Sequence, residues 1–169
     1  MKSIIAVALF LLSPSFLVPQ ANQGSSSQDM HHQGVNERGD KEMGFSHDKA
    51  THHFILFADG GAIEVKTNDA ADTETRDQIR MHFTHIAKMF ADGDFSIPML
   101  IHQENPPGAD VMKQMRDHIT YKFEELPQGG RIRITSTDAK AVAGIHKFLV
   151  FQIKDHETGD STAVTKAQQ

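Results

Sequence analysis

The fold of this chain depends most on one stretch, Gly60-Gly61-Ala62-Ile63-Glu64-Val65-Lys66-Thr67-Asn68-Asp69-Ala70, because a second stretch matches it. It aligns without gaps on Gly129-Gly130-Arg131-Ile132-Arg133-Ile134-Thr135-Ser136-Thr137-Asp138-Ala139, with five identities in eleven positions. In both, apolar and polar residues alternate after a glycine pair, as expected of a half-buried strand that leaves a tight turn. Two explanations stay open: an internal repeat, or turn and capping chemistry shared by two unrelated hairpins.

Each of these stretches follows a further predicted strand and precedes a predicted helix. Residues 51–57 and 119–126 are rich in β-branched and aromatic side chains and end at turn residues. Residues 72–90 and 139–156 carry apolar side chains at helical spacing. These stripes are Ile79, Phe83, Ile86 and Phe90 in the first helix, and Val142, Ile145, Leu149 and Ile153 in the second.

The order of these elements predicts an α+β fold. Two ββα units, residues 51–93 and 118–160, are expected to form one antiparallel sheet with both helices on one face. Between the units, a short helix is plausible over residues 109–117.

The remaining parts of the chain divide by composition. Residues 1–21 begin with a lysine and continue as a short apolar run, which is the pattern of a signal peptide. Residues 22–49 are polar and lack apolar periodicity, so a flexible tether is expected there. Residues 50–160 are long enough for one domain, and residues 161–169 form a tail.

Charge and cysteine usage exclude several classes of function. The 169 residues include 17 basic and 22 acidic side chains, a net charge of −5 that disfavours nucleic acid and anionic lipid as partners. The absence of cysteine excludes disulfides, thiolate nucleophiles, cysteine-ligated zinc and lipid attachment through a cysteine. Together with the signal-peptide pattern of residues 1–21, this predicts an exported protein, periplasmic or extracellular, with no membrane association after processing.

Several short motifs resemble those of a group of uncharacterised exported bacterial proteins. They are Met43-Gly44-Phe45, His52-His53-Phe54, His82-x-x-His85-Ile86-Ala87, Ala91-Asp92-Gly93-Asp94-Phe95 and Phe151-Gln152-Ile153-x-x-His156-x-Thr158-Gly159-Asp160. The resemblance covers most of the chain beyond Met43 and implies export and the α+β fold. Some members carry the name aspartate carbamoyltransferase, but the Ser-Thr-Arg-Thr loop of that enzyme is missing here. The resemblance therefore implies no mechanism.

Eleven histidines make metal binding the sharpest functional hypothesis. On the helix predicted over residues 72–90, His82, His85 and Met89 fall in a row beside the apolar stripe. Imidazole and thioether donors suit copper, zinc or haem iron. Two histidines one turn apart cannot complete a site, so a further ligand is expected from His52, His53 or His102, with His47 as another candidate.

The same residues also have plainer explanations. Histidines at the border of an apolar stripe often only pack there, and methionine commonly fills gaps in a core. Catalysis is not favoured, because the sequence contains no Gly-x-Ser-x-Gly elbow and no carboxylate pair beside a histidine. Phe148 and Phe151 lie off the stripe of the last helix, which predicts cover by another part of the chain or a homodimer through this face. The alternative to a metal or haem protein is thus a metal-free interaction or self-association module.

Overall fold

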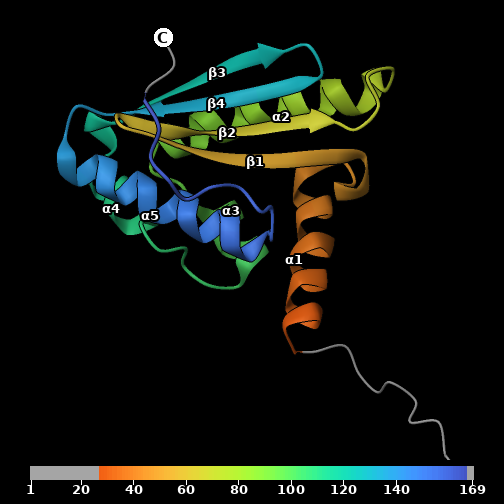
Figure 1. Ribbon diagram of the computed structural model, residues 1–169, viewed down its shortest axis with the longest axis horizontal. Coiled ribbons are helices and arrows are strands. Elements are labelled where there is room, and N and C mark those ends of the chain that lie inside the picture. Colours follow the sequence, from red (N-terminus) through yellow and green to blue (C-terminus); the bar gives the residue numbers. More distant parts are fainter. Residues whose placement is uncertain (1–26, 167–169) are drawn as a thin grey trace, which may run out of the picture.

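Four strands form one antiparallel sheet in the computed structural model, which describes residues 27–166 (Figure 1). They are β1 (Ala50–Phe57), β2 (Gly60–Thr67), β3 (Thr120–Leu126) and β4 (Gly129–Thr135), in the spatial order β1-β2-β4-β3. The two hairpins meet at the centre, where Ile63 of β2 lies opposite Ile132 of β4. The predicted α+β class is confirmed. The predicted signal peptide, residues 1–21, lies outside the described residues.

Two long helices cover one face of this sheet. Helix α2 (Thr73–Ala91) is capped by Asp72, and α5 (Ala139–Asp155) by Asp138, whose carboxylates accept hydrogen bonds from backbone N–H groups of the first turn. Helix α2 packs mainly on β3 and β4, whereas α5 packs on β1 and β2. Each helix therefore covers the hairpin of the other unit. The shared core lies between the two helices and the sheet.

The two glycine pairs occupy corresponding places in this sheet. A Cβ atom on Gly60 would lie 2.2 Å from the Ile134 carbonyl oxygen, and one on Gly129 would lie 2.0 Å from the Val65 carbonyl oxygen. The central strands can therefore approach each other only with glycine at these positions. This close packing gives a physical reason for the matching stretches, and a common origin by repeat stays a prediction.

The connection between the hairpins contains two short helices. The predicted helix over residues 109–117 is split into α4 (Ala109–Gln114) and a 3-10 turn, η2 (Arg116–His118). Helix α3 (Ser96–His102) was not predicted, because Pro98 and its shortness hide its pattern. Among the helices that the structure describes, none has both the length and the apolar character needed to span a bilayer.

The predicted flexible tether, residues 22–49, is wrong over most of its length. Residues Ser27–Met43 form helix α1, which leads through a 3-10 turn, η1 (His47–Lys49), into β1 (Figure 1). Val35 of this helix is 0% exposed, and Phe45 just beyond it is 5% exposed. Arg38 Nε also donates to the Ile101 carbonyl oxygen at 2.6 Å. A few specific contacts thus hold a helix whose composition suggests disorder.

The face predicted to support a homodimer is covered in part by the chain itself. Phe148 is 1% exposed and packs edge-to-face against Phe90 and Phe95. Phe151 contacts the ring of His102 from α3 at a centroid distance of 5.0 Å. The structure shows intramolecular cover over Phe148, whereas Phe151 is partly exposed and a homodimer through it stays a prediction.

Replacing Val35 by Asp should release α1 from the domain. A carboxylate at this buried position would lose its hydration without gaining a partner, which costs several kcal/mol. We expect limited proteolysis within residues 27–43 to become about tenfold faster or more, with the rest of the domain still protected. Gln33→Asp places the same charge at an exposed position of α1 and serves as the control. Equal cleavage rates in both variants and the wild type would contradict the docked position of α1.

Candidate functional site

Four histidines from distant parts of the chain line one small cavity at the end of α1. They are His52 of β1, His82 of α2, His102 of α3 and His156, which follows α5 directly. The cavity has a volume of about 70 Å³. Its lining is mostly apolar and includes Phe54, Ile86 and Phe148. Segments far apart in the sequence are therefore needed to build this site.

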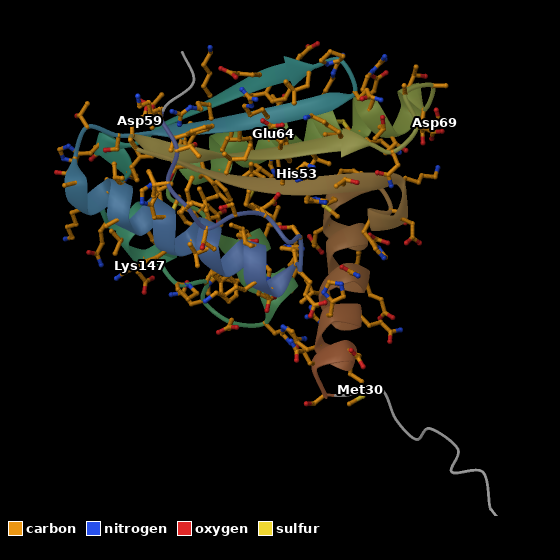
Figure 2. The ribbon with its side chains drawn as sticks, in the orientation of Figure 1. Met30, His53, Asp59, Glu64, Asp69 and Lys147 are labelled. Carbon is orange, nitrogen blue, oxygen red and sulfur yellow. The ribbon has the colours of Figure 1, made fainter. Side chains whose placement is uncertain are left out.

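Strand alternation decides which of two neighbouring histidines reaches the cavity. His52 shares the helix-covered face of β1 with the buried side chains of Phe54 and Leu56. His53 points to the opposite face, where its Nδ1 lies 2.9 Å from a carboxylate oxygen of Asp160. Figure 2 shows His53 beside Glu64, its partner in the register of β1 and β2.

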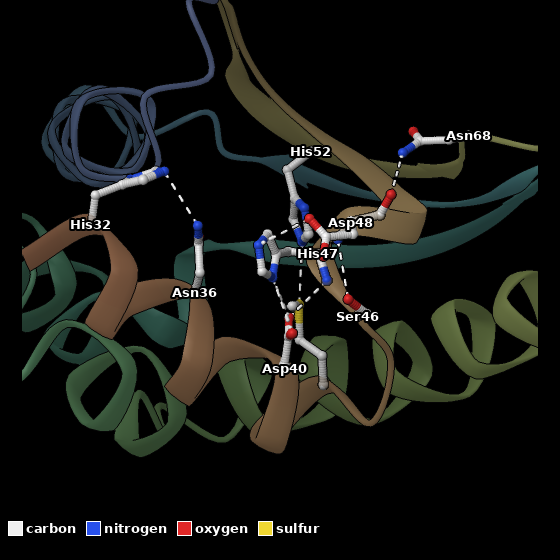
Figure 3. Close-up of polar contacts among 9 residues, drawn as sticks. His32, Asn36, Asp40, Ser46, His47, Asp48, His52 and Asn68 are labelled. Atoms are coloured by element: carbon white, nitrogen blue, oxygen red, sulfur yellow. Dashed lines mark hydrogen bonds and ion pairs between the residues drawn. The ribbon is translucent and has the colours of Figure 1, made fainter. Parts of the chain in front are cut away.

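His52 faces the sulfur atom at the end of α1. Its Nε2 lies 3.3 Å from Sδ of Met43, the last residue of that helix (Figure 3). A thioether is only a weak hydrogen-bond acceptor. The imidazole nitrogen is therefore poorly satisfied in the structure as it stands.

His156 lies between His52 and His102. Its ring is stacked on that of His52 with a centroid distance of 5.9 Å and an interplanar angle of 6°. It meets the ring of His102 edge-on at 5.0 Å. Phe45 contacts the rings of both His52 and His82, at centroid distances of 6.4 Å and 6.2 Å. The imidazoles of His52, His156 and His102 thus form a continuous group, and the ring of Phe45 links this group to His82.

The environment keeps three of these rings neutral at pH 7. Burial, followed by the neighbouring imidazoles His82 and His53, lowers the pKa of His52 to about 4. Burial and the proximity of His85 lower the pKa of His82 to about 4. Burial, then His52 and His102, lower the pKa of His156 to about 3. Neutral rings keep a nitrogen lone pair that can bind a metal ion.

His102 differs from the other three because both of its ring nitrogens are engaged. Nδ1 lies 2.5 Å from a carboxylate oxygen of Asp155, and Nε2 lies 3.0 Å from Oε1 of Gln152. The second oxygen of Asp155 binds His31 Nε2 of α1 at 2.9 Å. Asp155 thereby links α1 and α3 to the end of α5. His102 holds these elements together, and neither of its ring nitrogens is left for an ion.

A second, more polar cavity of about 210 Å³ lies between α1 and the start of β1. His52, His156 and Met43 border both cavities. His32 and His47 also line the outer one (Figure 3). Their rings are held by Asn36 and by Asp40, with ring nitrogens 3.3 Å from the amide of Asn36 and 2.9 Å from the carboxylate of Asp40. The outer cavity therefore lies beside α1 and shares the stacked pair of imidazoles with the inner cavity.

The structure brings together only half of the predicted ligands. His52, His82 and His102 line the inner cavity, whereas His53, His85 and Met89 do not. The predicted row on α2 does not converge on this cavity, because His85 is exposed and Met89 packs against the core. Sequence reasoning missed Met43 and His156 as site residues. Both occur in the short motifs Met43-Gly44-Phe45 and Phe151-Gln152-Ile153-x-x-His156, which were the signal that could have pointed to them.

No ready-made metal cage exists in the part of the chain that the structure describes. Within residues 27–166, no three His, Asp or Glu side chains stand close enough together to hold an ion in their present orientations. Comparisons of the chain with protein-family models, with curated proteins and with solved structures gave no significant match. The geometry of the histidine group itself is therefore the observation that bears on function.

Proposed function

We propose that this protein, which we expect to be exported, binds a transition-metal ion at the inner cavity. His52 is the central ligand, and Met43, His82 and His156 are the donors around it. The observation that carries the proposal is the 3.3 Å approach of His52 Nε2 to Met43 Sδ. Bonds of about 2.0 Å to nitrogen and 2.3 Å to sulfur at a tetrahedral angle separate two such donors by roughly 3.5 Å. The pair already has nearly the spacing that one shared ion requires.

A third donor is available from the stacked rings. Two imidazoles on one ion have centroids roughly 5–6.5 Å apart, given metal–nitrogen bonds of about 2 Å. The centroids of His52 and His156 are 5.9 Å apart, within that span. Because the two rings lie parallel, His156 must rotate about its side-chain torsions before its lone pair meets the ion. Among the described residues, the imidazoles do not form a three-histidine cage as they stand.

The size of the cavity favours an ion over haem. Pockets for small organic ligands usually measure roughly 300–1,000 Å³. The inner cavity of about 70 Å³ is several times smaller, and core side chains form much of its wall. Of the groups that the sequence predicts as bound, namely copper, zinc and haem, the cavity therefore favours copper and zinc.

Replacing His52 by Ala should weaken metal binding about 100-fold or more in calorimetry with tag-free protein. The central imidazole nitrogen would be lost, and neither Met43 nor the remaining rings could replace it. His85→Ala is the matched control, because His85 was predicted from the sequence as a ligand but is exposed. Thermal unfolding monitored by circular dichroism would show whether both variants keep the fold.

Two results would contradict this proposal. In one, His52→Ala binds as tightly as the wild type, or His85→Ala loses the ion instead. In the other, the wild type binds neither copper nor zinc more tightly than roughly millimolar. The metal-free interaction module would then be the better account of the chain.

A further inference from the structure

We infer that the ion is copper in its monovalent state, Cu(I). This inference rests on the proposed function and identifies which metal the same site takes. The donor set consists of one thioether, Met43, and neutral imidazoles of His52, His82 and His156. Thioether sulfur is a soft ligand that selects Cu(I), whereas zinc and Cu(II) gain little from it.

The nearby carboxylates are already bound within the protein. Asp40 accepts a hydrogen bond from the backbone N–H of His47 at 2.7 Å, and its carboxylate pairs with the His47 ring at 2.9 Å. Both oxygens of Asp155 are used by His31 and His102. A hard divalent ion that prefers oxygen donors would have to break these contacts, which anchor η1 and α1. A soft ion leaves them in place.

The low polarity of the cavity also discriminates by charge. Phe54, Ile86 and Phe148 form part of its wall. The cost of moving an ion from water into such surroundings rises with the square of its charge, so a divalent ion costs about four times as much as a monovalent one. Neutral imidazoles and a thioether offer no negative charge to offset the difference. These uncharged donors therefore favour a monovalent ion over a divalent one.

The outer cavity adjoins this site. It lies between α1 and the start of β1, and His52, His156 and Met43 border both cavities. The imidazoles of His32 and His47 line this cavity together with the thioether of Met43. The arrangement fits capture of a free or weakly complexed Cu(I) ion from solution.

Anaerobic competition against a chromophoric Cu(I) chelator, in parallel with zinc and Cu(II) titrations, tests this inference. The full chain, without a tag, should hold Cu(I) at least 100-fold more tightly than either divalent ion. Met43→Leu keeps the volume of the side chain and removes only the sulfur. It should weaken Cu(I) about tenfold or more and leave zinc binding unchanged. Met89→Leu, at a core-packed methionine away from the cavity, should change neither.

The possible outcomes distinguish the assignment of Cu(I) from the proposal that the inner cavity binds a metal ion. Zinc or Cu(II) binding as tight as Cu(I), with loss on His52→Ala, would overturn the Cu(I) assignment and leave the metal site standing. The same holds if Met43→Leu binds Cu(I) like the wild type. Binding of none of the three ions would overturn both. X-ray absorption of the Cu(I) form should show one sulfur neighbour that Met43→Leu removes.

Discussion

The metal-free protein should lose several kcal/mol of stability as the pH falls from 6.5 to 4. His52, His82 and His156 have an ordinary pKa of 6.5 when the chain is unfolded, but about 4, 4 and 3 in the fold. Below pH 6.5 the unfolded chain therefore binds protons that the folded chain does not. The free energy of unfolding must fall as the pH falls through this window, and it is unaffected by these groups above it.

The expected loss is large compared with the stability of an ordinary domain. At pH 5, each ring contributes up to about 2 kcal/mol, since one pKa unit corresponds to about 1.4 kcal/mol. Three rings give an upper limit of about 6 kcal/mol, and domains are typically stable by about 5–15 kcal/mol. Urea unfolding of chelator-treated protein at pH 7, 6 and 5 measures the effect.

A neutral side chain in place of one ring supplies the control for this pH dependence. His52→Gln should reduce the slope of stability against pH by the contribution of one proton. His118→Gln, at an exposed histidine, should leave the slope as in the wild type. A free energy of unfolding that stays constant from pH 7 to pH 5 would contradict the burial of these imidazoles.

Replacing Phe148 by Ala should destabilise the domain by about 3–5 kcal/mol. Phe148 is 1% exposed and contacts Phe90 and Phe95, so its removal leaves a cavity at the centre of the core. Denaturant unfolding at two protein concentrations measures the loss. Phe151→Ala, at a partly exposed position on the same helix, should cost clearly less.

Protein concentration separates this core role from the homodimer predicted for the same face. If Phe148 served a dimer, the stability of the wild type would increase with protein concentration, and Phe148→Ala would abolish that dependence. We expect the unfolding midpoint of Phe148→Ala to shift equally at both concentrations. A wild-type midpoint that rises with concentration and a variant midpoint that does not would contradict the structure.

The sheet and its two long helices could be predicted from the sequence because their signals are local. Alternation over residues 62–67 and 131–135 identifies the central strands, and apolar stripes over 72–90 and 139–156 identify the helices. The structure places α2 at Thr73–Ala91 and α5 at Ala139–Asp155, within two residues of these bounds at each end. The antiparallel arrangement followed from the two hairpins.

Helix α1 could not be predicted because its stabilising contacts are distant in the sequence. It buries little apolar surface, mainly Val35, and has no apolar stripe. Its other anchors are polar or sulfur contacts with Asp155, Ile101 and His52. Nothing within residues 27–43 indicates that these partners lie beside it.

The site was only partly predictable for a related reason. Helical spacing put His82 and His85 in one row, but solvent lies on the side to which His85 points. The partners of His82 are instead brought in by the start of β1, the end of α1 and the end of α5. Their proximity is a property of the tertiary fold, and no spacing rule within one element reveals it.

Nuclear magnetic resonance of the histidine side chains, before and after one equivalent of Cu(I) under anaerobic conditions, tests the central claim most directly. The ring nitrogen signals of His52, His82 and His156 should shift as their lone pairs bind the ion, together with the methyl signal of Met43. Signals of the exposed rings of His85 and His118 should stay in place. Shifts confined to exposed histidines, or no shifts at all, would contradict a metal site at the end of α1.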